Sequence, residues 1–220
     1  WWGNIRFEPA FTPDVCRLLS ASGLVAVTGG LEVASDRLLE KMDKGITVDQ
    51  VVQVTGAFSA AEVMVHAYLM YGFPTQTHQE AVDAMEVVRQ LFAEGLLDSA
   101  FWHRFVLTKH SGVMRDPERF GIELVSPASP SFAENDLEHR DRLNVDWSEF
   151  DEVLPDSLRH WMRGEALDKP VHRWFGGPVP ETSVSGERVR RVTTQVERSG
   201  KRWVWLGGDS LRMGNCLRVT

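Results

Sequence analysis

The stretch from Val63 to Met70 has the sequence VMVHAYLM, an almost unbroken apolar run that is followed by Gly72-Phe73-Pro74. A run of this length indicates a strand buried on both faces, which is typical of a parallel sheet. Thr77 and Glu80 have the spacing of a capping box, so a helix is predicted to begin directly after the turn. Gly95 is expected to end that helix. The stretch therefore predicts one strand–turn–helix unit.

The same alternation of strand and helix continues on both sides of this unit. The expected strands are residues 4–7, 24–28, 63–70 and 100–107, and the expected helices are residues 12–23, 35–42, 47–58 and 77–95. This order favours parallel strands joined by right-handed helical crossovers. Four units are too few for a complete eight-unit barrel. The sequence thus predicts an α/β fold in the form of a partial barrel, an open sheet or a fragment.

The character of the chain changes after residue 125. Residues 126–186 are acidic and interrupted by prolines, and they are predicted to form a linker with short helices, the better one from Pro155 to Arg163. Residues 187–220 are predicted to form a small antiparallel β unit. Its expected strands are residues 188–198 and 201–206 around a turn at Ser199-Gly200, with a third strand within residues 211–219. We therefore expect three regions: 1–125, 126–186 and 187–220.

Composition narrows the classes of partner. The net charge of -7 disfavours nucleic acid, and no apolar run approaches the ~20 residues that span a membrane. Cys16 and Cys216 lie at opposite ends of the chain and make neither a disulfide framework nor a cysteine-rich metal cluster, although one disulfide between them stays open. A reducing, cytoplasmic setting is expected. The sequence starts at Trp1-Trp2-Gly3, with neither Met nor a basic segment, so we expect no signal peptide and expect upstream residues to be missing.

Three segments at predicted strand or helix ends carry residues that suit ligand binding. In parallel α/β folds, function gathers at the carboxyl ends of the strands. Gly29 and Gly30 let a ligand approach the backbone, and Glu32 accepts hydrogen bonds from hydroxyls or an amine. Lys44 and the turn at Gly72-Phe73-Pro74 are the other two. Each segment alone also has a structural interpretation, as a turn or as a helix end.

Together these segments resemble one family. The strings from Gly30 to Leu39, from Met42 to Gly45 and from Tyr68 to Thr77 look like the radical S-adenosylmethionine (radical SAM) family, most of all its cobalamin-binding or methylthiotransferase-like members. Phe105 to Ile122 looks closer to the cobalamin-associated group. The resemblance runs from Ile5 to Ile122, about half of the chain.

The resemblance implies a horseshoe-like partial (β/α)6 barrel, of which this chain holds the later strands. It also implies a 4Fe-4S cluster, held by a CxxxCxxC loop, that cleaves S-adenosylmethionine (SAM) to a 5′-deoxyadenosyl radical in an oxidoreductase or transferase. Cobalamin would be a further cofactor. The substrate, small or macromolecular, is left open. The implied site places Glu32 and Ser35 near the SAM ribose, Lys44 at its carboxylate, Gly72 and Phe73 against the adenine, and Arg6 in the same neighbourhood inside the barrel.

The chain also departs from the family pattern. It contains no CxxxCxxC and no glycine-rich segment to meet the SAM amino group, and Val33-Ala34-Ser35 stands where many relatives have Ser-Gly-Ser. We therefore expect a fragment that by itself neither ligates a cluster nor turns over. Two alternatives stay open: a methylthiotransferase acting on tRNA or a ribosomal protein, and a cluster-free barrel acting as a binding or scaffold protein. Arg188, Arg190 and Arg191 form the only dense basic patch that could favour RNA.

Histidines and aromatic residues in the strands are expected to serve packing first. His66 is predicted to line the core or the barrel, and His103 is the better candidate for the barrel interior, on the side of Phe101 and Phe105. His103 and His110 lack a metal-ligand spacing, so no metal site is predicted there.

Overall fold

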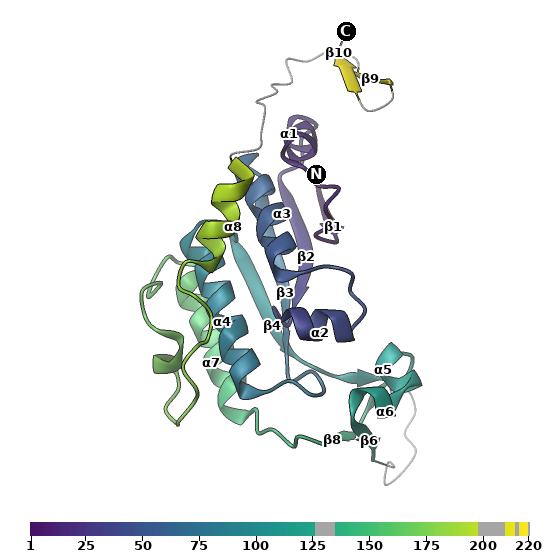
Figure 1. Cartoon of the computed structure of the whole chain (residues 1–220), viewed down its shortest axis with the longest axis vertical. Coiled ribbons are helices and arrows are strands. Elements are labelled where there is room, and N and C mark those ends of the chain that lie inside the picture. Colours follow the sequence, from purple (N-terminus) through teal and green to yellow (C-terminus); the bar gives the residue numbers. More distant parts are fainter. Residues whose placement is uncertain (126–134, 198–209, 214–215, 220) are drawn as a thin grey trace.

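A four-stranded parallel sheet forms the centre of the computed structural model, which describes residues 1–125, 135–197, 210–213 and 216–219 (Figure 1). The strand order is β1-β2-β3-β4, and each neighbouring pair is parallel. The strands are β1 (Trp2–Ile5), β2 (Ala26–Glu32), β3 (Met64–Tyr71) and β4 (Ser99–Arg104). The predicted α/β class with parallel strands is confirmed, and β4 ends three residues before the predicted limit.

The predicted connecting helices are present, and local capping explains where they begin. They are α1 (Pro13–Ala21), α2 (Asp36–Lys41), α3 (Val48–Ala60) and α4 (His78–Ala93). The hydroxyl oxygens of Thr12, Thr47 and Thr77 each accept a hydrogen bond from a backbone N–H of the first helical turn. Thr77 and Glu80 make the complete capping box that the sequence predicts.

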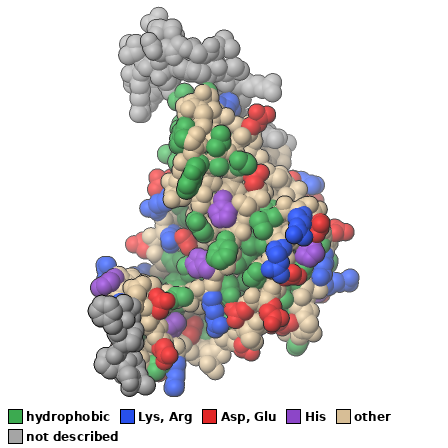
Figure 2. Space-filling model, turned by 180° about the vertical axis from the view of Figure 1, so that it is seen from behind, with side chains coloured by type: hydrophobic (Ala, Val, Ile, Leu, Met, Phe, Trp, Pro, Cys, Tyr) green, Lys and Arg blue, Asp and Glu red, His purple; other side chains and the backbone are tan. Residues whose placement is uncertain are grey.

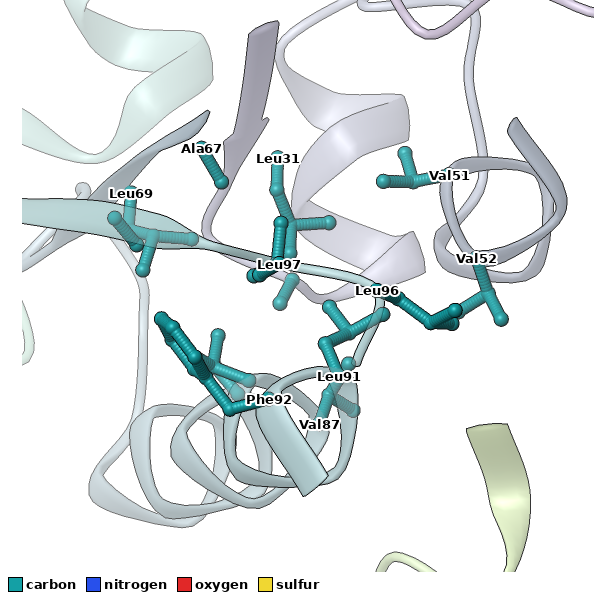
Figure 3. Packing of buried hydrophobic residues seen from close by; sticks show 14 of the residues in the cluster. Leu31, Val51, Val52, Ala67, Leu69, Val87, Leu91, Phe92, Leu96 and Leu97 are labelled. Atoms are coloured by element: carbon teal, nitrogen blue, oxygen red, sulfur yellow. The ribbon is translucent and has the colours of Figure 1, made fainter. Parts of the chain in front are cut away.

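The core lies between the sheet and the helices α3 and α4. Leu31 of β2 and Leu69 of β3 point toward Val51 of α3 and Leu91 of α4, and all four side chains are buried (Figure 3). In a strand, alternate side chains face opposite sides, so this layer takes only every second residue of β2 and β3.

The opposite face of the sheet is open, which corrects one prediction. The apolar run was expected to be buried on both faces, but Met64 and Tyr68 are 53 % and 48 % exposed. They alternate with the buried residues Val65, Ala67 and Leu69, and no described helix covers their side. Seen from behind, apolar and histidine side chains lie over the middle of the molecule (Figure 2). The run is thus apolar on both faces and buried on one.

The segment predicted as a linker contributes to the same core. Helix α7 (Ser148–Trp161) packs against β4 and α4, and it buries Phe150, Leu154 and Trp161. It begins seven residues before the predicted helix and carries Pro155 in its interior. This segment is therefore part of the core and not a linker. Its apolar residues recur at helical spacing and form one buried stripe. A 3-10 helix, η1 (Val171–Trp174), also buries Val171 in this core.

The strand predicted at residues 188–198 is a helix, α8 (Arg188–Glu197). Val189 and Val192, three residues apart, are both buried, and α8 lies against α3 and α4. This spacing puts both valines on one helical face, whereas strand alternation would put them on opposite sides. The predicted strand at 201–206 and its turn lie outside the described residues. Residues 211–219 hold parts of two short antiparallel strands, β9 (Ser210–Met213) and β10 (Cys216–Val219), instead of one.

A second, smaller apolar cluster packs the segment that follows β4 against residues after β2 and β3. It includes Val33, Leu38, Phe73 and Phe120. Its elements are β5 (Leu107–Thr108), α5 (Gly112–Arg115), α6 (Pro117–Phe120), β6 (Ile122–Leu124), β7 (Asp136–Leu137) and β8 (His139–Asp141). β5 pairs with β7 and β6 pairs with β8, both antiparallel. Among the described helices, none has the length and apolar character that crossing a membrane requires.

Candidate functional site

Three of the six predicted site residues line one pocket at the carboxyl ends of β1 and β2. The pocket has a volume of about 360 Å³. Its lining residues are Arg6, Gly30, Glu32, Met42, Asp43, Lys44 and Ile46. Arg6 follows β1, Glu32 ends β2, and Lys44 follows α2. Segments that are 38 residues apart in the chain therefore meet, as expected for the carboxyl edge of a parallel sheet.

An irregular end of β2 positions Glu32. The pairing register with β3 shifts between Gly30 and Glu32, which marks a bulge. Glu32 and Ala34 have φ values of 57° and 44°, in the left-handed region that non-glycine residues rarely adopt. Such a conformation costs free energy and persists only where the surrounding structure enforces it. The bulge re-aims the carboxylate of Glu32 toward the pocket.

Lys44 is held by the turn that ends α2. Asp43 and Gly45 on either side have φ values of 56° and 65°, and the Lys44 N–H donates to the carbonyl of Leu39 at 3.0 Å. Lys44 Nζ then donates to Glu32 Oε1 at 2.8 Å. The Lys44 side chain is 40 % exposed and that of Glu32 15 % exposed. The ion pair is therefore accessible to a ligand from the lysine side.

Arg6 closes the pocket from β1. Its Nη2 donates to the Lys44 carbonyl, and its Nε lies 3.5 Å from Glu8 Oε1. The guanidinium thus ties the α2 turn to the sheet, so it positions Lys44 as well as lining the pocket. Both cations of the site are partnered, which keeps them in place without a ligand.

Ser35 lies in a different environment. Its hydroxyl donates to Glu80 Oε1 at 3.3 Å, and it lines a separate pocket of about 330 Å³ with Asp83 and Arg188. Glu80 also receives two hydrogen bonds of 2.7 Å from Arg37. The structure therefore does not bring Ser35 together with Glu32 and Lys44.

Gly72 and Phe73 also lie apart from the pocket. The Gly72 N–H donates to Gln76 Oε1 at 2.7 Å, and the residue has a φ of 71°. The Phe73 ring is 3 % exposed and packs edge-on against Phe105 and Phe120, with centroids 5.2 and 5.8 Å away. This ring is enclosed by its neighbours and offers no free face for an adenine. Met42, Asp43 and Ile46 flank Lys44 and share its pocket, but the sequence predicted none of them as a site residue.

The cysteine chemistry of this chain does not fit a 4Fe-4S cluster. Cys16 is fully buried in the core, where its Sγ donates weakly to the Phe11 carbonyl at 3.8 Å. Burial raises the pKa of this thiol to about 12, although Arg17 opposes the change. A cluster needs several thiolates. In the described part of the chain, no three His, Cys, Asp or Glu residues are placed to hold a metal ion.

The arginines of the predicted basic patch are engaged in ion pairs on α8. Arg188 bonds Asp49 at 2.9 Å, and Arg190 bonds Glu94 at 3.0 Å. Arg191 lies 3.8 Å from Glu187. These acidic partners neutralise the positive charge of the arginines, which binding to a nucleic-acid phosphate backbone would require.

No family model matches the chain, and no curated protein does.

Proposed function

We propose that the chain is the later part of a radical SAM barrel and that its Arg6–Glu32–Lys44 pocket binds the amino-acid end of SAM. The observation that carries this proposal is the Lys44–Glu32 ion pair inside a pocket at the carboxyl edge of a parallel sheet. The open inner face of four parallel strands supports the partial barrel. A cytoplasmic setting agrees with Cys16 as a buried free thiol.

The ion pair complements a zwitterion. A ligand carboxylate can accept from Lys44 Nζ while a ligand ammonium or hydroxyl donates to the Glu32 carboxylate, so each protein charge exchanges one partner for another. Neither charge is left unpaired in the bound state, which avoids a cost of about 1–3 kcal/mol for an unsatisfied group. The pocket volume of 360 Å³ falls within the range of small-molecule sites, roughly 300–1,000 Å³.

Within this proposal the chain contributes binding and orientation. When bound beside a reduced cluster, SAM supplies the radical chemistry. The residues of this chain do not fit such a cluster, so its ligands would come from elsewhere. Cobalamin and the methylthiotransferase subclass stay predictions of the sequence resemblance. The ion pairs of Arg188, Arg190 and Arg191 favour a small-molecule role over RNA binding.

Calorimetric titration of the 220-residue chain with SAM tests the proposal. Glu32→Gln and Lys44→Met each remove one charge of the pair, and each is expected to weaken SAM binding at least tenfold, since a hydrogen bond to a charged group contributes about 1.5–3 kcal/mol. Glu40→Gln is the matched control, because this carboxylate is exposed on the neighbouring helix α2 outside the pocket. The control should bind like the wild type.

The cluster-free binding protein is the second candidate, and the buried Cys16 favours it. If the chain has that function, the pocket is not expected to bind SAM. Equal SAM affinity in the wild type, Glu32→Gln and Lys44→Met, or no SAM binding at all, would contradict the proposed SAM site and favour this candidate.

A further inference from the structure

Two exposed aromatic rings lie side by side on the open face of the sheet. Gly30, Tyr68 and Phe101 are cross-strand neighbours in β2, β3 and β4. Adjacent strands are about 4.8 Å apart, so the two rings start from positions one strand apart. Tyr68 is 48 % exposed and Phe101 56 % exposed. We call Gly30, Tyr68 and Phe101 the aromatic shelf.

A histidine ring packs beside the shelf. His66 packs edge-on against Tyr68 with ring centroids 5.1 Å apart, and its Nδ1 lies 2.7 Å from Ser99 Oγ. Burial lowers the pKa of His66, which favours its neutral form. Met70, a polarizable side chain that suits contacts with rings, follows Tyr68 on the same face.

The shelf is continuous with the pocket described above. Gly30 belongs to both, since it lines the pocket and pairs with Tyr68. A side chain at this position would collide with the Glu32 carboxylate. The missing side chain therefore leaves room for the Glu32 carboxylate over Gly30, so the ion pair lies next to the shelf.

We propose that the aromatic shelf binds a planar aromatic molecule beside the ligand of the pocket. Flat rings stack on or pack edge-on against exposed aromatic side chains with a specific geometry that non-planar apolar groups lack. That this molecule is the substrate rests on the proposed function, whereas its binding to the shelf does not.

The size of the shelf favours a small molecule over a protein partner. The exposed parts of Tyr68 and Phe101 amount to roughly 200 Å² if each side chain offers about 150–250 Å². A stable protein interface takes about 800 Å² from each partner. The polar row of Thr28, His66 and Ser99 separates the shelf from the exposed Met64 farther along β3, so the apolar surface is not one large patch.

Fluorescence titration of the 220-residue chain with 2-naphthol tests the shelf. Tyr68→Leu and Phe101→Leu keep an apolar side chain but remove the flat ring, and each is expected to weaken 2-naphthol binding at least fivefold. Met162→Leu is the control, because Met162 is similarly exposed, at 42 %, at the end of α7. Decahydro-2-naphthol, which has the same skeleton without aromatic rings, should compete at least fivefold less well.

Unchanged 2-naphthol affinity in both leucine variants, or equal binding of the saturated analogue, would overturn the proposal. So would sedimentation of the wild type as a dimer that Phe101→Leu dissociates, because a second copy would then be the occupant. Lys44→Met separates the two claims. This variant should bind SAM more weakly and 2-naphthol as the wild type does. A wild-type chain that binds 2-naphthol but not SAM contradicts the proposed function alone. A wild-type chain that binds SAM but not 2-naphthol contradicts the shelf alone.

Discussion

At the residue scale, two adjacent glycines in β2 face different surroundings on opposite sides of the sheet. A Cβ on Gly29 would lie 2.6 Å from the ring of Phe7, which is fully buried in the core. A Cβ on Gly30 would instead meet the end of the Glu32 side chain, which can move. Because alternate strand residues face opposite sides, the first glycine serves packing and the second serves the pocket.

This difference predicts separable effects of Gly29→Ala and Gly30→Ala. Gly29→Ala should lower the free energy of unfolding by about 1–3 kcal/mol, as overpacking of a core does. Gly30→Ala should change stability little but displace the Glu32 carboxylate from Lys44, so SAM binding should weaken severalfold. Urea unfolding and calorimetric titration of both variants measure the two effects. Equal destabilisation with unchanged SAM binding in Gly30→Ala would contradict this assignment.

At the element scale, the strands and helices of residues 1–104 were predictable because their signals are local. Thr47 and Thr77 cap helices that begin one residue later, and the apolar runs locate the strands within a few residues. The prediction failed at α8, where valines and threonines resemble a strand but tertiary packing of Val189 stabilises a helix. At α7 it gave the second half of the helix but missed the first seven residues and the buried apolar stripe, which Pro155 and acidic residues obscured.

The N-terminus of α4 gives a pH-dependent prediction. Burial by itself raises the pKa of Glu80, but hydrogen bonds from Arg37 and Thr77 outweigh it and lower the pKa below its usual range. A lowered carboxyl pKa stabilises the fold above the unfolded-state pKa of about 4.3 and loses that effect as pH falls through the folded-state value. The urea concentration at the unfolding midpoint should therefore decrease as the pH is lowered from 6 to 3, and the decrease should be smaller in Glu80→Gln. Glu40→Gln, an exposed carboxylate, is the control and should follow the wild type; an identical fall in Glu80→Gln would refute the claim.

At the scale of the whole molecule, the candidate site could be predicted in part. The resemblance to the radical SAM family predicted that Arg6, Glu32 and Lys44 share one site, and the structure places them in one pocket. Ser35 and Phe73 are separated from it by Glu80 and Phe120, partners 45 and 47 residues away in the chain. No local pattern in the sequence indicates such contacts, and the same is true of the open sheet face.

The most direct measurement compares two ligands that differ only at the amino-acid end. S-adenosylhomocysteine carries that end and 5′-methylthioadenosine lacks it. We predict that the wild-type chain binds S-adenosylhomocysteine at least tenfold more tightly, because in the proposed complex Lys44 contacts the carboxylate and Glu32 contacts the ammonium. This assignment moves Glu32 to the ammonium from the ribose, where the sequence resemblance had placed it. In the Glu32→Gln/Lys44→Met double variant the two affinities should become nearly equal. The same affinity ratio in the wild type and the double variant would contradict the assignment of this pocket to the amino-acid end of SAM.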